Sequence, residues 1–126
     1  FILRHPGWRG PAAVRVLGGD FNAVATMPEV SWLAEHETLD IRSVFEPASL
    51  AGATHPLPPR NDQPGRCIDF LFTIVARGEM TPIVSRAAIA LNSPIEGVWP
   101  SDHAAVVADL DCPAATRTGI TRLASP

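Results

Sequence analysis

The chain has 126 residues, of which 46% are apolar, and its 10 basic and 13 acidic side chains give a formal net charge of −3. This length suits one small domain or a piece of a larger one, and the apolar share excludes a disordered chain. The slightly negative charge argues against a broad electrostatic grip on nucleic acid, because surfaces that track phosphates need a basic excess. No apolar stretch has the ~20 residues that span a bilayer, and no signal peptide is visible, so the cellular compartment stays open.

The first part of the chain predicts a strand, a corner and a helix. Residues 14–17 form a short β-rich run that stops at Gly18-Gly19, and we expect a buried strand that ends in a loop at Asp20-Phe21-Asn22. The segment Thr26-Met27-Pro28-Glu29 has the features of a helix start, with a Thr N-cap and Pro in the first turn. Apolar residues at helical spacing follow, so the pattern predicts a helix over about 27–36.

The rest of the chain predicts short strands between segments rich in helix and strand breakers. Residues 40–45 suit a short strand or a connection, and residues 47–66 form a long Pro- and Gly-rich loop, which in a compact domain is more often functional than idle. Further strands are expected over 66–73, 83–91 and 104–110. Four or five strands with one clear helix and no βαβ alternation indicate an α+β fold, with one mixed or antiparallel sheet and a helix on one face.

A first polar motif follows the first strand, in Gly18-Gly19-Asp20-Phe21-Asn22. If the chain stays extended, the side chains of Asp20 and Asn22 point the same way, and the two glycines let the backbone approach a ligand closely. The alternative is an Asx-type turn, in which both side chains satisfy backbone groups. Taken alone, the turn is the commoner outcome.

A second motif places a carboxylate inside an apolar strand, in Ile68-Asp69-Phe70. A buried carboxylate without a partner costs several kcal/mol, so Asp69 should be paired or hydrogen-bonded. Pairing with Arg66 is one alternative, because buried acids are often merely paired. Alternation along the strand puts residues 67, 69 and 71 on one face and residues 68, 70 and 72 on the other.

The third motif is Ser101-Asp102-His103, directly before the last predicted strand. In an extended chain, neighbouring side chains face opposite ways, so Asp102 and His103 need separate partners. The same argument excludes a serine-hydrolase triad within the tripeptide, because triad residues must converge in space. No G-x-S-x-G elbow occurs elsewhere in the chain.

In this order, the three motifs resemble the endonuclease/exonuclease/phosphatase superfamily, whose members share the DNase I-like fold. The resemblance runs from about residue 14 to residue 111 and is closest over residues 99–110. It implies a four-layer α/β sandwich, of which this chain supplies the C-terminal half, about one sheet within residues 1–111. Residues 112–126 are expected to form a flexible tail.

The resemblance also implies an activity, divalent-metal-dependent hydrolysis of a phosphoester by in-line attack of water. His103 would be the catalytic histidine and Asp69 would orient it. Asp20 would position or deprotonate the water, and Asn22 would donate a hydrogen bond to the phosphate. Asp102 would help to bind Mg²⁺ or Mn²⁺, which take oxygen ligands. The substrate class, whether nucleic acid, phospholipid or small phosphoester, is not specified by these motifs.

One departure from the family pattern is serious. The family carries an early Asn, a metal-binding Glu and a Thr-His-Leu segment upstream of the Gly-Asp-Phe-Asn motif, and none of them is matched here. We therefore expect the N-terminal half of the same domain as a partner, weak Mg²⁺ binding and activity little above background by the chain alone, and association through an uncovered apolar sheet face. The alternatives are a non-catalytic, truncated or degenerate relative that acts as a binding module, and a chance match of short motifs.

The other histidines carry weaker signals. We interpret His36 as a solvated helix-end histidine and His55 as a solvated loop histidine, because a lone histidine is usually not a metal ligand.

Overall fold

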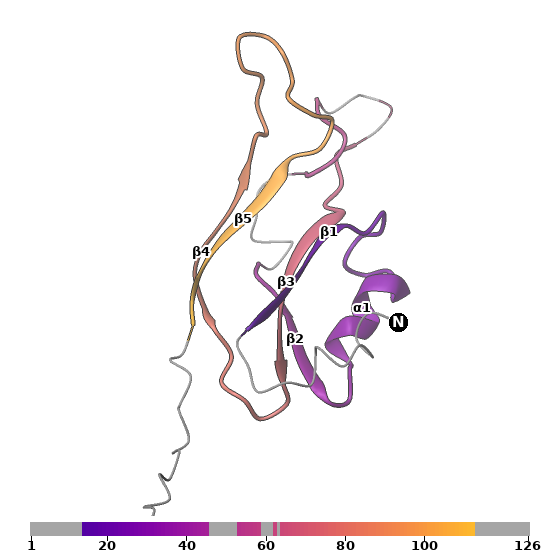
Figure 1. The fold of residues 1–126 in the computed structure, drawn as a ribbon. Helices are drawn as coiled ribbons and strands as arrows, with labels where there is room; N and C mark the ends of the chain where they lie inside the picture. Colours follow the sequence, from indigo (N-terminus) through magenta and orange to yellow (C-terminus); the bar gives the residue numbers. More distant parts are fainter. Residues whose placement is uncertain (1–13, 46–52, 59–61, 63, 113–126) are drawn as a thin grey trace, which may run out of the picture.

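The computed structural model describes residues 14–45, 53–58, 62 and 64–112, which form one helix and five strands (Figure 1). The elements in chain order are β1 (Arg15–Asp20), α1 (Pro28–Ala34), β2 (Leu39–Ser43), β3 (Asp69–Ala76), β4 (Ile83–Ala90) and β5 (Ala105–Asp111). All the predicted strands are present, with ends that differ by a few residues, but the expectation that the first strand is buried is wrong, because β1 has no fully buried residue. The predicted tail lies outside the described residues, apart from residue 112.

A three-stranded antiparallel sheet forms the centre of the molecule, in the order β1-β3-β2. β1 continues through both glycines, and its last residue, Asp20, pairs directly with Asp69, the first residue of β3. A Cβ atom at Gly18 would lie 2.8 Å from the Cδ1 atom of Leu71, so the absence of a side chain lets β1 and β3 approach closely. The sheet register therefore fixes two carboxylates side by side at one end.

Helix α1 covers one face of this sheet and closes the core (Figure 1). Val30 and Leu33 are its buried residues, and Ile74 at the middle of β3 has 0% exposed surface. The predicted helix is confirmed, with Pro28 in its first turn, where the missing N–H costs no hydrogen bond. The predicted Thr26 cap is wrong. Met27 is the N-cap residue, and no side chain caps the helix.

The side-chain alternation sorts residues 69–72 of β3 as predicted, but the prediction is wrong for Cys67, which precedes the strand and packs against the core on the side of α1. Phe70 and Phe72 are buried in the core cluster on the side of α1, and Ile68 is also buried. Their neighbours, residues 67, 69 and 71, are only partly buried. Asp69 therefore lies on the face opposite the helix, where a polar partner can reach it.

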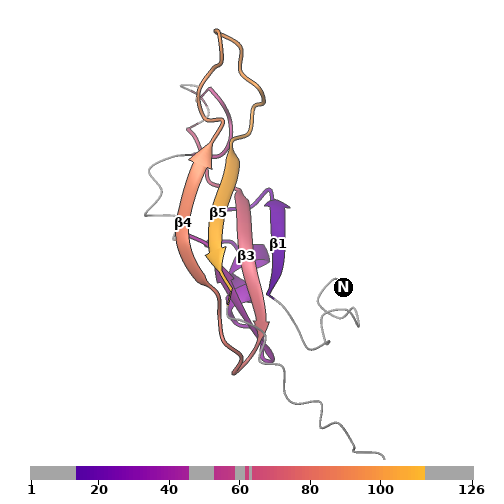
Figure 2. The same ribbon diagram turned by 60° about the vertical axis from the view of Figure 1, so that its left-hand side comes forward.

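β4 and β5 form an antiparallel hairpin that is less well packed than the central sheet. β5 runs beside β3 (Figure 2). No residue of either hairpin strand is fully buried, and Val107 is 47% exposed.

The predicted fold class is wrong. The described residues form two small antiparallel sheets and one seven-residue helix, which is a mainly β architecture and neither an α+β fold nor part of a four-layer α/β sandwich. The physical reason lies in the connections, because the described segments between strands are rich in Pro and Gly and form turns and bends in place of covering helices. One helix can cover only one sheet face.

No helix among the described residues combines the length and the apolar character needed to cross a membrane.

Candidate functional site

The polar motifs meet at one corner of the molecule, where the central sheet and the hairpin approach each other. Asp20 ends β1, Asp69 begins β3, and Asp102 and His103 lie in the bend just before β5. Segments more than 30 residues apart in sequence are thus joined, since His103 and Asp69 are separated by 34 positions. A cluster of ionisable side chains such as this is not needed for the packing of a protein core.

His103 and Asp69 form the central contact of this corner. The Nδ1 atom of His103 lies 3.0 Å from the Oδ2 atom of Asp69, and both side chains are largely shielded from solvent. The expected contact between these two residues is present, and among the described residues no ion pair joins Asp69 to Arg66. This contact holds the imidazole ring through Nδ1 and leaves the Nε2 atom available for another partner.

The charge state of His103 follows from its acidic surroundings. The hydrogen bond to Asp69 raises the pKa of His103 above its ordinary value, and the negative charges of Asp69, Asp20 and Asp102 act in the same direction, while burial opposes them. Asp20 belongs to these acidic surroundings because it lies directly opposite Asp69 in the sheet register. The site therefore favours a protonated imidazole.

A buried threonine, Thr54, holds the corner together through a set of hydrogen bonds that we call the brace. The side chain of Thr54 is fully buried, and its Oγ1 atom accepts hydrogen bonds from the backbone N–H groups of Ile68 at 3.0 Å and Asp69 at 3.1 Å. Its carbonyl oxygen accepts the N–H of Ala104 at 2.8 Å. One residue of the long loop thus ties the start of β3 to the residue that follows His103.

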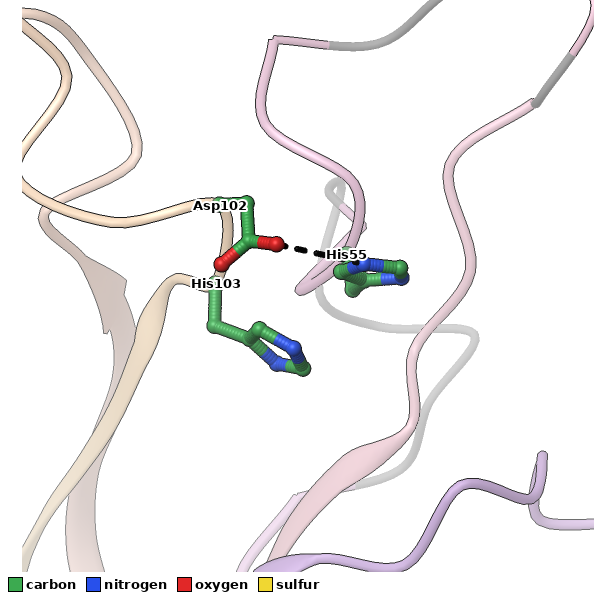
Figure 3. Close-up of side chains that lie close together, drawn as sticks. All are labelled: His55, Asp102 and His103. Carbon is green, nitrogen blue, oxygen red and sulfur yellow. Dashed lines mark ion pairs between the residues drawn. The ribbon is translucent and has the colours of Figure 1, made fainter.

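His55 lies beside this brace and faces the same corner (Figure 3). Its ring centroid is 4.4 Å from that of His103, and its Nε2 atom lies 3.9 Å from the Oδ2 atom of Asp102. Its Nδ1 atom is buried and has no hydrogen-bond partner among the described residues. The interpretation of His55 as a solvated loop histidine is wrong, whereas His36 does lie at a helix end, where its Nδ1 atom accepts backbone N–H groups.

Asp102 and His103 have the separate partners that the sequence predicted, Asp69 for the imidazole and His55 near the carboxylate. The expectation that their side chains face opposite ways is wrong. Residues 102 and 103 form a bend and are not part of the strand. Their ligand atoms, together with one from His55, all lie within 4.8 Å of one another.

The Gly-Asp-Phe-Asn corner adopts the turn that was the alternative interpretation. The backbone N–H of Asn22 donates to the Oδ1 atom of Asp20 at 2.7 Å, and Asn22 has a left-handed φ of 51°. Asparagine tolerates this conformation better than most residues. The turn holds the Asp20 carboxylate in place beside Asp69, so a structural role and a chemical role are compatible at this position.

The described residues fit a hard cation only in part. Mg²⁺ is usually held by one or two carboxylates together with water and phosphate oxygens. Asp102, whose side chain is 73% exposed, supplies one carboxylate, and its two neighbours in the group offer nitrogen. A magnesium ion at Asp102 would therefore depend on phosphate and water for most of its ligands.

Two members of the site, Thr54 and His55, carry no signal in the sequence beyond their place in a Pro-rich loop.

No protein-family model, curated protein or solved structure matches the chain. The roles given to Asp20, Asn22, Asp69, Asp102 and His103 by the superfamily resemblance therefore stay predictions, to be judged on the geometry of the site.

Proposed function

We propose that this corner hydrolyses a phosphoester by in-line attack of water, as a divalent-metal-dependent hydrolase. The observation that carries the proposal is the 3.0 Å contact between His103 and Asp69, at the sheet end that also holds Asp20. Three short motifs from distant parts of the sequence meet there. A purely structural sheet end does not need a histidine, its carboxylate partner and a second carboxylate together.

His103 acts on the phosphate. Because Asp69 binds Nδ1, the Nε2 atom is left to donate a hydrogen bond to a phosphate oxygen. Because its pKa is raised, the His103 ring stays protonated at pH values at which an ordinary histidine would be neutral. A positioned cation of this kind stabilises the negative charge that develops in the transition state.

Asp20 acts on the water. Its Oδ1 atom is held by the N–H of Asn22, which fixes the carboxylate while its second oxygen can orient a water molecule or accept a proton from it. Asn22, whose backbone N–H binds this carboxylate, is exposed, and its side-chain amide donates to the phosphate. A Mg²⁺ or Mn²⁺ ion, when bound through Asp102, supplies Lewis-acid polarisation of the phosphoryl group.

The direct test is turnover of bis-p-nitrophenyl phosphate with Mg²⁺ by the purified chain and by its variants. We expect activity little above background, because one carboxylate holds the metal weakly, and complete loss of that activity in His103→Ala. His36→Ala is the matched control and should keep the activity, since its ring bonds only the backbone at the helix end. Equal residual rates in His103→Ala and the natural chain would contradict the proposal.

A binding measurement separates the hydrolase from the alternative of a non-catalytic binding module. In the presence of Mg²⁺, a phosphodiester that is not cleaved, such as dimethyl phosphate, should shift the NMR signals of the His103 ring and leave those of His36 unchanged. A shift without any turnover of the cleavable substrate supports the binding module. Neither turnover nor a shift would show that the corner does not act on phosphoesters.

A further inference from the structure

We infer that His55, Asp102 and His103 form a binding site for a first-row transition metal ion, with Zn²⁺ as the ion that fits best. The inference does not rest on the proposed hydrolysis, because it uses His55, which has no part in that chemistry. It rests on the spacing of one ligand atom from each of these residues, on the Asp69 carboxylate that contacts His103, and on the identity of the ligand atoms as nitrogen or oxygen.

The spacing of the ligand atoms suits one ion. One atom from each residue lies within 4.8 Å of the other two. The distance of 3.9 Å between His55 Nε2 and Asp102 Oδ2 is too long for a hydrogen bond. Two ligands about 2.1 Å from a tetrahedral Zn²⁺ are roughly 3.4 Å apart, so a small rotation of the Asp102 side chain would place both atoms on one ion.

His103 has the support that metal-binding histidines need. A ligating imidazole usually donates its other N–H to a carboxylate, which fixes the ring and makes it a better ligand. The Asp69 contact to Nδ1 provides this support and directs Nε2 toward the metal. Asp69 is therefore a positioning residue for the ion and does not bind it.

The loop holds His55 in place beside His103. Its backbone exchanges hydrogen bonds with Arg66, since the His55 N–H donates to the Arg66 carbonyl at 3.0 Å and the Arg66 N–H donates to the His55 carbonyl at 2.7 Å. The carbonyl of Asp102 is likewise bonded, to the N–H of Leu57 at 2.8 Å. Both backbones are thus tied before any metal arrives, which lowers the ordering cost of binding.

The atom types select the metal. Two imidazole nitrogens and one carboxylate oxygen suit Zn²⁺ and its neighbours, whereas Mg²⁺ takes oxygen ligands. Three protein ligands leave a fourth position open, and the exposed Asp102 gives an ion access from solvent. Zinc on His103 Nε2 would occupy the atom that the hydrolase needs for phosphate, so the zinc-bound and phosphate-bound states should exclude each other.

The test is a calorimetric titration of the metal-free chain with Zn²⁺ alone, with Co²⁺ as a second probe because its visible absorption reports coordination geometry. We expect one Zn²⁺ per chain, a tetrahedral Co²⁺ spectrum that Zn²⁺ abolishes, and no displacement by excess Mg²⁺. His55→Phe keeps a ring against His103 but cannot bind metal, and it should lose the tetrahedral spectrum. Asp69→Asn should bind Zn²⁺ about 10–100-fold more weakly.

The controls decide between this site and adventitious binding. His36→Ala should bind Zn²⁺ as the natural chain does, and circular dichroism of every variant checks that it folds. Unchanged Zn²⁺ affinity in a folded His55→Phe variant would overturn the inference, as would the absence of binding by the natural chain. Displacement by Mg²⁺ at equal concentration would also overturn it, because nitrogen ligands would then have no part. Equal turnover by the natural chain and by His103→Ala, together with intact Zn²⁺ binding by the natural chain, leaves the metal site standing and rejects only the proposed function.

Discussion

The central sheet and the hairpin contribute equally to the candidate site but differ sharply in packing. The sheet residues Asp20 and Asp69 stand at the end of strands whose inner face is covered by α1, with Ile74 fully buried. The hairpin residues Asp102 and His103 lead into a strand in which no side chain is fully buried. One half of the site is built on a core, and the other half is held against it by hydrogen bonds.

This difference indicates which contacts control the geometry of the site. Because burial in the hairpin is modest, hydrophobic packing cannot by itself fix the position of the His103 ring. The bonds of Thr54 to both sides and the Asp69–His103 contact must do so. Perturbing the core should therefore unfold the protein, whereas perturbing the brace should open the site in a protein that remains folded.

The largest effect is expected in the core. Ile74→Ala removes methyl groups from the most buried side chain of β3 and should lower the free energy of unfolding by about 2–5 kcal/mol, measured by urea denaturation. Ile74→Val is the matched control and should cost only about 0.5–1.5 kcal/mol. If Ile74→Ala costs less than the brace variant described next, the core is not the stable half of the molecule.

A smaller but more local effect is expected at the brace. Thr54→Val keeps the shape of the side chain but removes the oxygen that accepts the N–H groups of Ile68 and Asp69, at a cost of about 1–3 kcal/mol. The NMR signals of the His103 ring should change with it, because the start of β3 loses its tie. Thr54→Ser keeps the hydroxyl and should restore most of the stability. Identical stability of the Val and Ser variants would show that the hydroxyl bonds are not needed.

The local elements were predictable from sequence because they depend on local patterns. Alternation in β3 placed Asp69 on the face away from Phe70, and the Pro28 segment marked the start of the helix. The α+β class was wrong because it came from counting elements and from a family resemblance, whereas the number of layers depends on how connections pack. Nothing in the spacing of the strands showed that they divide into two sheets.

The candidate site was predictable only where one residue required another. A carboxylate in an apolar strand needs a partner, and this requirement predicted that Asp69 would be paired or hydrogen-bonded. The choice of His103 as that partner came from the superfamily resemblance, since the residues alone left Arg66 open as an alternative. Thr54 and His55 make no such demand in the sequence, since a threonine and a histidine in a Pro-rich loop are ordinary surface residues. Their roles depend on two long-range backbone contacts, to Arg66 and to Ala104, that no local pattern encodes.

The contact between the two halves should also make stability depend on pH in metal-free buffer. Because the folded state raises the pKa of His103, the contribution of this pair is fully present below the ordinary histidine pKa of about 6.5 and is lost as pH rises through the folded value. Unfolding free energies measured across this window should therefore fall with rising pH, and Asp69→Asn should flatten the slope. A slope that is unchanged in Asp69→Asn would assign the effect to other groups.

The smallest effect is expected in the hairpin, where Val107 is 47% exposed. Val107→Thr keeps the branched shape that suits a strand and exchanges one methyl group for a hydroxyl that water can reach, so the free energy of unfolding should change by less than about 0.5 kcal/mol. The same measurement at a buried site would show a loss several times larger. A loss of more than about 1 kcal/mol would mean that Val107 is covered in solution. The difference in packing between the central sheet and the hairpin would then not hold, because association with another chain would give the hairpin a packed face of its own.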